Sequence, residues 1–139
     1  MELAAFEGDW RISRRIEDRR NGLSGRFEGR ACFTPEAGGG LRYEETGTLR
    51  LGAGPPMAAA RRYLWRETLG MIEVWFDDGR FFHAFDPARP DPAAHHDCPP
   101  DSYDVRYDFA GAPRAWTSRW QVAGPRKAHL IESHYTRSE

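Results

Sequence analysis

The feature that most constrains the fold of this chain is a repeated alternation of apolar and polar residues in short segments. Residues 23–33 show it most clearly, because Phe27, Ala31 and Phe33 share one parity and Arg26 and Glu28 share the other. Successive side chains of a strand point to opposite faces, so a period of two predicts half-buried strands. We therefore expect an all-β chain built from antiparallel strands.

Turn signals between these segments set their number and connection. Asn21-Gly22 and Asp78-Gly79 are typical of tight hairpin turns between strands. The connections between the other segments are also short and rich in Gly and Pro, which indicates about eight or nine strands. The expected elements are a short helical turn over 3–6, a first strand over 8–16, and further strands over 23–33, 41–51, 59–66, 71–76, 80–85, 102–109, 115–122 and 127–137.

An antiparallel up-and-down barrel is the architecture that this pattern favours. Closing a meander of strands removes its exposed edges, and eight strands leave an interior that is filled or holds one small ligand. A two-sheet β-sandwich is the alternative. Residues 1–139 form a single expected domain, since no linker or repeat divides them. Residues 86–101 are rich in Pro, and we expect an irregular loop there. One interpretation is that this loop folds over the barrel mouth as a lid above His83, Cys98, Asp101 and Tyr103.

The charge balance narrows the classes of partner. Lys and Arg number 20 and Asp and Glu number 21, so the basic excess of a nucleic-acid or anionic-membrane protein is missing. The residues after Met1 resemble no secretion signal, and no stretch approaches the roughly 18 apolar residues of a membrane span. Cys32 and Cys98 are too few for a disulfide scaffold. These features predict a cytoplasmic protein with two free thiols.

Two positions at the ends of the chain carry a resemblance to a known superfamily. Gly8-x-Trp10 opens the first expected strand, and Arg137 ends the last. In this respect the chain resembles the calycins, which include lipocalins and fatty-acid-binding proteins. The resemblance implies an up-and-down barrel with a ligand-binding habit, in which Arg137 stacks on Trp10 as a cation–π pair that closes the barrel.

The overall pattern also resembles an uncharacterised family of small bacterial proteins. That resemblance covers most of the chain but implies no activity. It rests on Gly8-x-Trp10, Tyr43-Glu44-Glu45, Asp78-Gly79-Arg80-x-Phe82-His83, His96-x-Cys98-x-x-Asp101-x-Tyr103 and Gly124-Pro125-Arg126-Lys127.

A high aromatic content suggests that the barrel interior serves as a ligand cavity. The chain has 5 Trp, 5 Tyr and 8 Phe, and such side chains both fill cores and line ligand sites. Phe27, Phe81 and Trp116 are expected on the inner face with the other aromatics. From strand parity, the candidate cavity residues are Tyr43, Glu45, Tyr63, Trp65, His83, Tyr103, Trp120 and His129.

Glu45 is the inward carboxylate among these candidates, and a buried carboxylate needs a partner. One interpretation is an ion pair with Arg62 or Arg119. Otherwise Glu45, beside an inward His or Arg, orients the polar end of a ligand, or it serves with His83 as a general base on a small substrate.

Metal and haem sites are further hypotheses. His83, His96, Cys98 and Asp101 carry groups that ligate zinc, although their spacing matches no standard zinc finger. The alternative is that the histidines are solvated on a loop and the thiol packs as a small apolar group. The calycin resemblance adds haem as a candidate ligand, with His129 or His134 as the axial residue.

Three functions therefore follow from the sequence. The first is a barrel that binds a small molecule of unknown identity in an aromatic cavity. The second is a packed barrel that binds a protein partner or forms a homodimer. The third is an enzyme, which the absence of phosphate-loop, dinucleotide and nucleophile-elbow motifs makes the weakest of the three.

Overall fold

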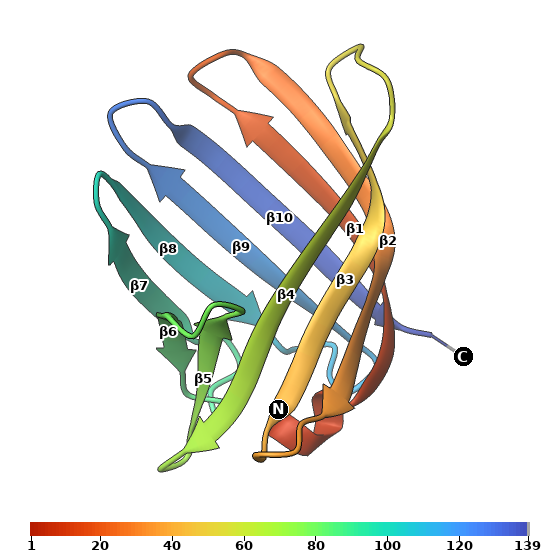
Figure 1. Ribbon diagram of the computed structural model, residues 1–139, viewed down its shortest axis with the longest axis vertical. Coiled ribbons are helices and arrows are strands. Elements are labelled where there is room, and N and C mark those ends of the chain that lie inside the picture. The colour runs from red at the N-terminus through yellow and green to blue at the C-terminus, as the bar shows by residue number, and fades with distance from the viewer. Residues whose placement is uncertain (139) are drawn as a thin grey trace.

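A computed structural model describes residues 1–138 and shows a single antiparallel sheet of ten strands curled into a barrel (Figure 1). The strand order is β6-β5-β4-β3-β2-β1-β10-β9-β8-β7, so every neighbouring pair along it is consecutive in sequence except β1 with β10. The elements are η1 (Leu3–Phe6), β1 (Gly8–Asp18), β2 (Leu23–Pro35), β3 (Leu41–Leu51), β4 (Met57–Thr68), β5 (Met71–Phe76), β6 (Phe81–Phe85), β7 (Ala93–Cys98), β8 (Asp101–Asp108), β9 (Ala115–Ala123) and β10 (Ala128–Arg137).

The barrel is closed by packing instead of by a complete hydrogen-bonded ring. The end strands β6 and β7 lie next to each other, yet no ladder joins them within the described residues (Figure 1). Side chains seal the seam, since Phe82 packs against His96 with ring centroids 5.3 Å apart. The all-β, up-and-down architecture is confirmed, and the β-sandwich alternative is wrong because one continuous sheet contains all ten strands.

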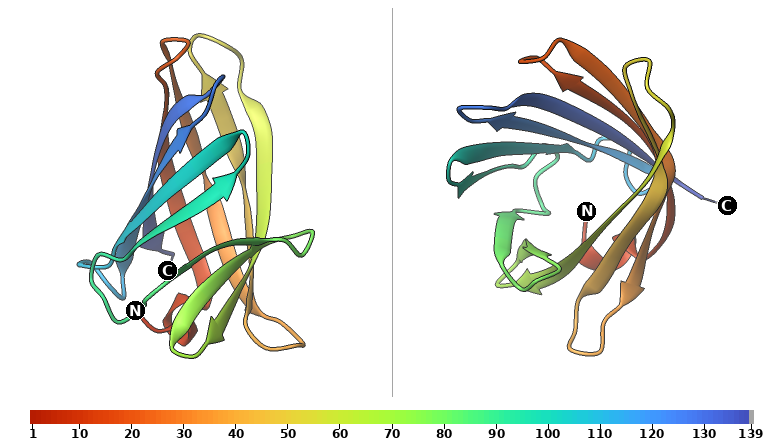
Figure 2. Two further views of the ribbon diagram at one scale, coloured as in Figure 1. Left: turned by 90° about the vertical axis from the view of Figure 1, so that its left-hand side faces the viewer. Right: turned by 45° about the horizontal axis from the view of Figure 1, so that its top comes forward.

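The N-terminal turn η1 closes one end of the barrel. Phe6 is fully buried there and packs against the rings of Phe33, Trp65 and Trp116, with centroids 5.6, 5.1 and 5.3 Å away. Its carbonyl oxygen accepts a hydrogen bond of 2.8 Å from Trp10 Nε1. Figure 2 shows that the hairpin turns β1–β2, β3–β4 and β9–β10 spread apart at the opposite end.

The segment expected to be an irregular loop contains a strand. Ala93–Cys98 forms β7 and pairs with β8 from Ala93↔Arg106 to Cys98↔Asp101, which raises the strand count to ten. This strand was not predicted from the sequence, because its half-buried positions carry Ala94, His96 and Cys98 instead of large apolar residues. The preceding residues 86–92 also run along β8, since Pro92 O accepts a hydrogen bond from Tyr107 N.

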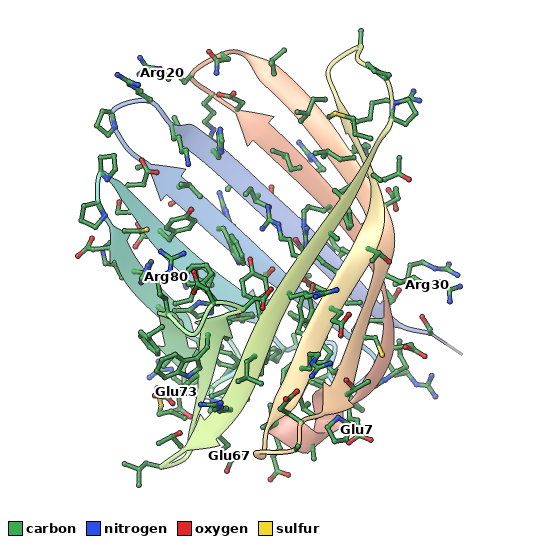
Figure 3. The ribbon with its side chains drawn as sticks, viewed as in Figure 1. Glu7, Arg20, Arg30, Glu67, Glu73 and Arg80 are labelled. Carbon is green, nitrogen blue, oxygen red and sulfur yellow. The ribbon has the colours of Figure 1, made fainter. Side chains whose placement is uncertain are left out.

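Among residues 1–138 the buried charged side chains are Arg14 and Glu45, which are described below. In Figure 3, Arg30 extends from β2 away from the barrel wall. Cys32 and Cys98 are both free thiols, as expected, and burial raises the pKa of Cys32 to about 11. Within residues 1–138 the structure contains no helix long and apolar enough to cross a membrane.

Candidate functional site

A buried ion pair between β1 and β3 forms one wall of the candidate site. Arg14 Nη1 donates to Glu45 Oε2 at 2.6 Å and Nη2 donates to Oε1 at 2.9 Å. The two side chains are only 6% and 2% exposed. Arg14 has the same parity on β1 as Trp10 and Ile12, so the strand geometry itself turns the guanidinium inward. A forked pair of this kind is among the strongest charge-assisted contacts.

Hydroxyl groups complete the hydrogen bonding of this pair. Arg14 Nε donates to Ser133 Oγ at 2.7 Å, and Nη2 lies 3.3 Å from Tyr135 Oη. The hydroxyl of Tyr43 donates to Glu45 Oε1, and the two tyrosine oxygens are 2.9 Å apart. Burial alone would raise the pKa of Glu45, but the hydrogen bonds and charge of Arg14 hold it below its usual value. Burial raises the pKa of both tyrosines, so they remain neutral hydrogen-bonding groups.

His83 on β6 lies on another wall of the same interior. Its Nε2 is 2.8 Å from Tyr107 Oη, while Nδ1 is buried without a hydrogen-bond partner among residues 1–138. Burial, helped by the charge of His96, lowers the pKa of His83 to about 3. The imidazole is therefore neutral at physiological pH. Burial also raises the pKa of Tyr107 well above its usual value, so its hydroxyl keeps its proton.

Between these walls lies a cavity inside the barrel. Its open space totals about 350 Å³ when the part joined to solvent is included, but the centre of a water molecule can occupy only about 20 Å³ of it. The accessible space suits a guest the size of one or two water molecules. The lining residues are Arg14, Tyr43, Glu45, Arg61, Tyr63, Trp65, Val74, His83, Tyr107, Trp116, Ser118, Trp120 and Tyr135.

Three tryptophans of this lining share an unusual property. The indole nitrogens of Trp65, Trp116 and Trp120 are buried, and none has a hydrogen-bond partner within the described chain. Indole N–H is a donor only, and a buried donor without an acceptor costs about 1–3 kcal/mol. Together with His83 Nδ1, four ring nitrogens around one cavity are left without a protein partner in residues 1–138.

Arg61 on β4 contributes a charge to the cavity from its exposed side. The guanidinium carbon lies 5.5 Å from the centroid of the Trp120 ring. Its charge also acts on Tyr63 and Glu45, although burial remains the main cause that raises the pKa of Tyr63. The next residue, Arg62, is on the outer face beside Glu44, with an N–O distance of 3.8 Å.

Most of the residues expected in the cavity from parity do line it. These are Tyr43, Glu45, Tyr63, Trp65, His83 and Trp120, with Trp116.

Tyr103 and His129 do not line the cavity. Tyr103 is half-buried and packs on Phe82 with ring centroids 5.5 Å apart, and His129 is half-buried beside Asp18 at 3.8 Å. Phe81 is 42% exposed, because the register of β5 and β6 shifts between Val74 and Trp75 and Phe82 turns inward instead.

The expected zinc ligands are not gathered into one site. Within residues 1–138 no group of three or more His, Cys, Asp or Glu side chains lies close enough to hold a metal ion. His83 faces the interior from β6, whereas His96 packs on Phe82 from β7. Cys98 and Asp101 end the β7–β8 hairpin, where Asp101 pairs with Lys127 at 3.2 Å. The four residues therefore fall into two pairs, His83 with His96 around the Phe82 ring and Cys98 with Asp101 at the hairpin.

The histidines expected to bind haem are also away from the cavity. His134 is exposed, and His129 lies beside Asp18 outside the cavity lining. The structure thus gives neither residue the apolar pocket that an axial haem ligand requires.

Strand parity contained a signal for residues that the sequence analysis missed. Arg14 shares the inward phase of β1, Ser118 shares that of Trp116 on β9, and Tyr107 and Tyr135 are inward aromatics of β8 and β10. Arg14 was not expected inside because arginine is rarely buried unless it is paired. Its partner, Glu45, was expected to pair with Arg62 or Arg119, both of which are exposed.

At the closed end of the barrel, Arg137 lies over Trp10. The guanidinium carbon is 3.9 Å from the ring centroid, and the two residues are register partners of β10 and β1. Arg137 Nη1 donates to Glu7 O at 2.7 Å, and Nη2 donates to Ala5 O. The side chain thus ties η1 to both terminal strands.

These features define an antiparallel β-barrel with a buried ion pair and a small polar and aromatic cavity. The chain belongs to a family of unknown function, DUF6314, whose family model matches residues 6–137. No protein with a curated description matches the sequence.

Three solved structures are similar to this chain to different degrees. A protein of unknown function from the DUF3598 family of Nostoc punctiforme is 7% identical with a TM-score of 0.64, and the match covers 99% of this chain and 49% of that one. The chain therefore spans about half the length of that protein. The redesigned barrel mFAP1, bound to DFHBI, has a TM-score of 0.45 at 10% identity, with 97% of each chain covered. A de novo designed fluorescence-activating β-barrel has a TM-score of 0.43 at 15% identity, and the match covers 99% of this chain and 100% of that one. Of these matches, the DUF3598 protein bears on the fold alone.

Proposed function

We propose that this protein is a calycin-like barrel of the cytoplasm that binds a small molecule in its interior cavity. The observation that carries the proposal is the set of four buried ring nitrogens without a partner among residues 1–138 around one cavity. The stacking of Arg137 on Trp10 supports the calycin resemblance, and the two free thiols agree with a reducing compartment.

The energetic argument rests on the cost of unpaired polar groups. Each buried donor without an acceptor costs about 1–3 kcal/mol, so folded proteins rarely leave several of them together. The described part of the chain offers no acceptor to Trp65, Trp116 or Trp120. An acceptor must therefore come from what enters the cavity, and a ligand that supplies it recovers part of this cost.

The ion pair has a positioning role in this proposal. Both oxygens of Glu45 accept hydrogen bonds, and Arg14 uses Nε and both terminal nitrogens within the protein. Neither group is left available as a general acid or base, which disfavours the enzyme hypothesis. The network instead fixes the orientation of Tyr43 and Tyr135, so it presents a rigid wall to the ligand.

Native mass spectrometry with an absorption spectrum tests the proposal, on protein purified without denaturation. We expect a bound mass on the wild type and none on Ser118→Val, because the added methyl groups fill a cavity in which the centre of a water molecule can occupy only about 20 Å³. Thr117→Val is the matched control, since Thr117 lies outside the cavity lining on the same strand. If the wild type carried no co-purified mass and also bound nothing from a metabolite extract, the result would count against the proposal. A bound mass that Ser118→Val retains would count against it as well.

A packed barrel that forms a homodimer is the second candidate function. The small enclosed space favours it, and so does the edge of β4. Residues 57–62 of β4 pair with β3 on one side, while β5 pairs only from Tyr63 onward. Unpaired strand edges are sites of chain association. Light scattering after size-exclusion chromatography would give a dimer mass if this candidate holds, and a monomer mass would remove it.

A further inference from the structure

We propose that a hollow on the outer face of β1, β2 and β3 binds the dianionic phosphate group of a small phosphate monoester. The site lies outside the barrel and is separate from the interior cavity, so it goes beyond the function proposed above. Three arginines carry the inference, Arg15, Arg26 and Arg50, through their register, the balance of charge around them and the hollow that they share.

The three arginines form a row across adjacent strands. Arg15 of β1 is the register partner of Arg26 of β2, and Arg26 is in turn the register partner of Arg50 of β3. All three are exposed, whereas their chain neighbours Arg14 and Phe27 are buried, so the row lies on the outer face. Like charges directly opposite each other on neighbouring strands are destabilising. The row therefore has a cost to stability that a bound anion would offset.

The charges around the row leave it positive. Arg15 is partly compensated, because it pairs with Glu17 at 3.0 Å and has Glu132 of β10 as its register partner on the other side. Within residues 1–138, Arg26 and Arg50 have no carboxylate partner. The hollow is lined by the three arginines and by one acidic residue, Glu17, which leaves a net charge of +2. A dianion matches this charge, whereas a monoanion leaves half of it uncompensated.

The hollow gathers the arginines around one space. The centres of water molecules can occupy about 350 Å³ of it, which is ample for a phosphate group. The lining also includes Ser24, whose hydroxyl is a further donor. No aromatic side chain is part of the lining, so a nucleobase would find no ring on which to stack. The hollow thus suits a small phosphorylated molecule better than a nucleic acid.

The number of acceptor oxygens favours a monoester over other anions. A phosphate monoester presents three terminal oxygens, so each of three guanidinium groups can donate to one of them. Guanidinium groups remain charged and bind phosphate oxygens through paired N–H donors. A carboxylate and a phosphodiester each offer two such oxygens and a single charge. The monoester is therefore the anion that can use all three arginines.

The test is a titration of the full chain followed by a proton–nitrogen correlation spectrum, at about pH 7.5, where a monoester is mainly dianionic. The ionic strength is held constant because salt screens exposed charges. The probes are methyl phosphate, a dianion, and dimethyl phosphate and acetate, which are monoanions. We expect methyl phosphate to move the amide signals of Ser24, Arg26 and Gly52 and to leave that of Ser118 in the interior cavity in place. Its dissociation constant should be about 1 mM or below, and about tenfold lower than that of either monoanion.

Variants of single arginines test the row itself. Arg26→Gln and Arg50→Gln should each weaken the binding of methyl phosphate at least about fivefold. Arg30→Gln is the matched control and should leave the affinity unchanged, because Arg30 is on the same face of β2 but outside the lining and extends away from the barrel wall (Figure 3). Thermal unfolding separates lost binding from lost structure. Arg26→Gln should melt no lower than the wild type, since it removes the central charge of the row.

Each claim has a result that would overturn it. No amide shift at about 10 mM methyl phosphate, or unchanged affinity in both Arg26→Gln and Arg50→Gln, would overturn the site. Equal binding of dimethyl phosphate or acetate would overturn the dianion class. Binding to vesicles that contain phosphatidic acid, without binding of methyl phosphate, would overturn the small-molecule source in favour of a lipid head group. None of these results bears on the interior cavity, which native mass spectrometry tests separately.

Discussion

Removing the charge of Glu45 should be one of the most damaging conservative changes in this chain. Glu45→Gln keeps the size and one acceptor oxygen of the side chain, but it leaves the guanidinium of Arg14 buried without a counter-charge. The Arg14 side chain is 6% exposed, so solvent cannot replace the lost carboxylate. Breaking a buried pair in this way typically costs about 3–5 kcal/mol.

That cost is large against the stability of a domain of this size. At about 0.05–0.15 kcal/mol per residue, a chain of 139 residues has roughly 7–20 kcal/mol to lose. The variant should therefore fold with a clearly lower stability. Urea unfolding followed by tryptophan fluorescence gives the free-energy change directly. Glu44→Gln is the matched control, because Glu44 is exposed and its pairs with Arg42 and Arg62 are loose, at 3.7 and 3.8 Å. It should change stability by less than about 1 kcal/mol.

The double variant Arg14→Met with Glu45→Gln separates the ion pair from simple loss of packing. With no buried charge left, it should be less destabilised than the sum of the two single variants by about 2–4 kcal/mol. Single-variant costs that add within about 0.5 kcal/mol would refute the reasoning, since they would mean that the two side chains act independently.

Three further outcomes are expected. The stability that neutral His83 contributes is complete above its unfolded pKa of 6.5 and is lost as the pH falls toward its folded pKa of about 3. Between pH 6.5 and 4.5 the free energy of unfolding should therefore fall with decreasing pH more steeply for the wild type than for His83→Gln, by up to about 1.4 kcal/mol per pH unit. Arg137→Lys should lower the stability by about 1–2 kcal/mol in urea unfolding, because an ammonium cannot both stack on Trp10 and bond two carbonyls, and an unchanged midpoint would contradict this. Gly29→Ala should cost about 2 kcal/mol or more in thermal unfolding, since its Cβ would lie 2.3 Å from a backbone oxygen, while Gly38→Ala, with nothing within 4 Å, should be neutral.

The strand architecture was readable from the sequence where alternating positions carry large side chains. In β3 the inward parity of Leu41, Tyr43 and Glu45 matches their burial, and the turn signals placed most hairpins correctly. The prediction failed at β7 because its half-buried positions carry Ala94, His96 and Cys98, which give little hydrophobic contrast with their exposed neighbours. It also failed in β6, where the register shift beside Trp75 reversed which phenylalanine faces inward.

The site was readable only in part, for a different reason. Parity identified Glu45 and His83 as inward groups, but parity assigns a face and not a partner. Arg14 lies 31 positions from Glu45 in the sequence, and the two side chains meet across β2, which lies between their strands. Only the register of β1, β2 and β3 determines that they come together. The size of the cavity could not be predicted from the sequence either, because the same aromatic residues can fill an interior or line a space.

The most direct measurement is a high-resolution crystal structure of the protein as isolated, read at the indole nitrogens of Trp65, Trp116 and Trp120. The account predicts a non-protein acceptor atom within hydrogen-bond distance of at least one of them, in the space bordered by His83 and Ser118. Indole rings rotated to bond protein carbonyls, with the cavity closed by side chains, would contradict the account and leave a packed barrel.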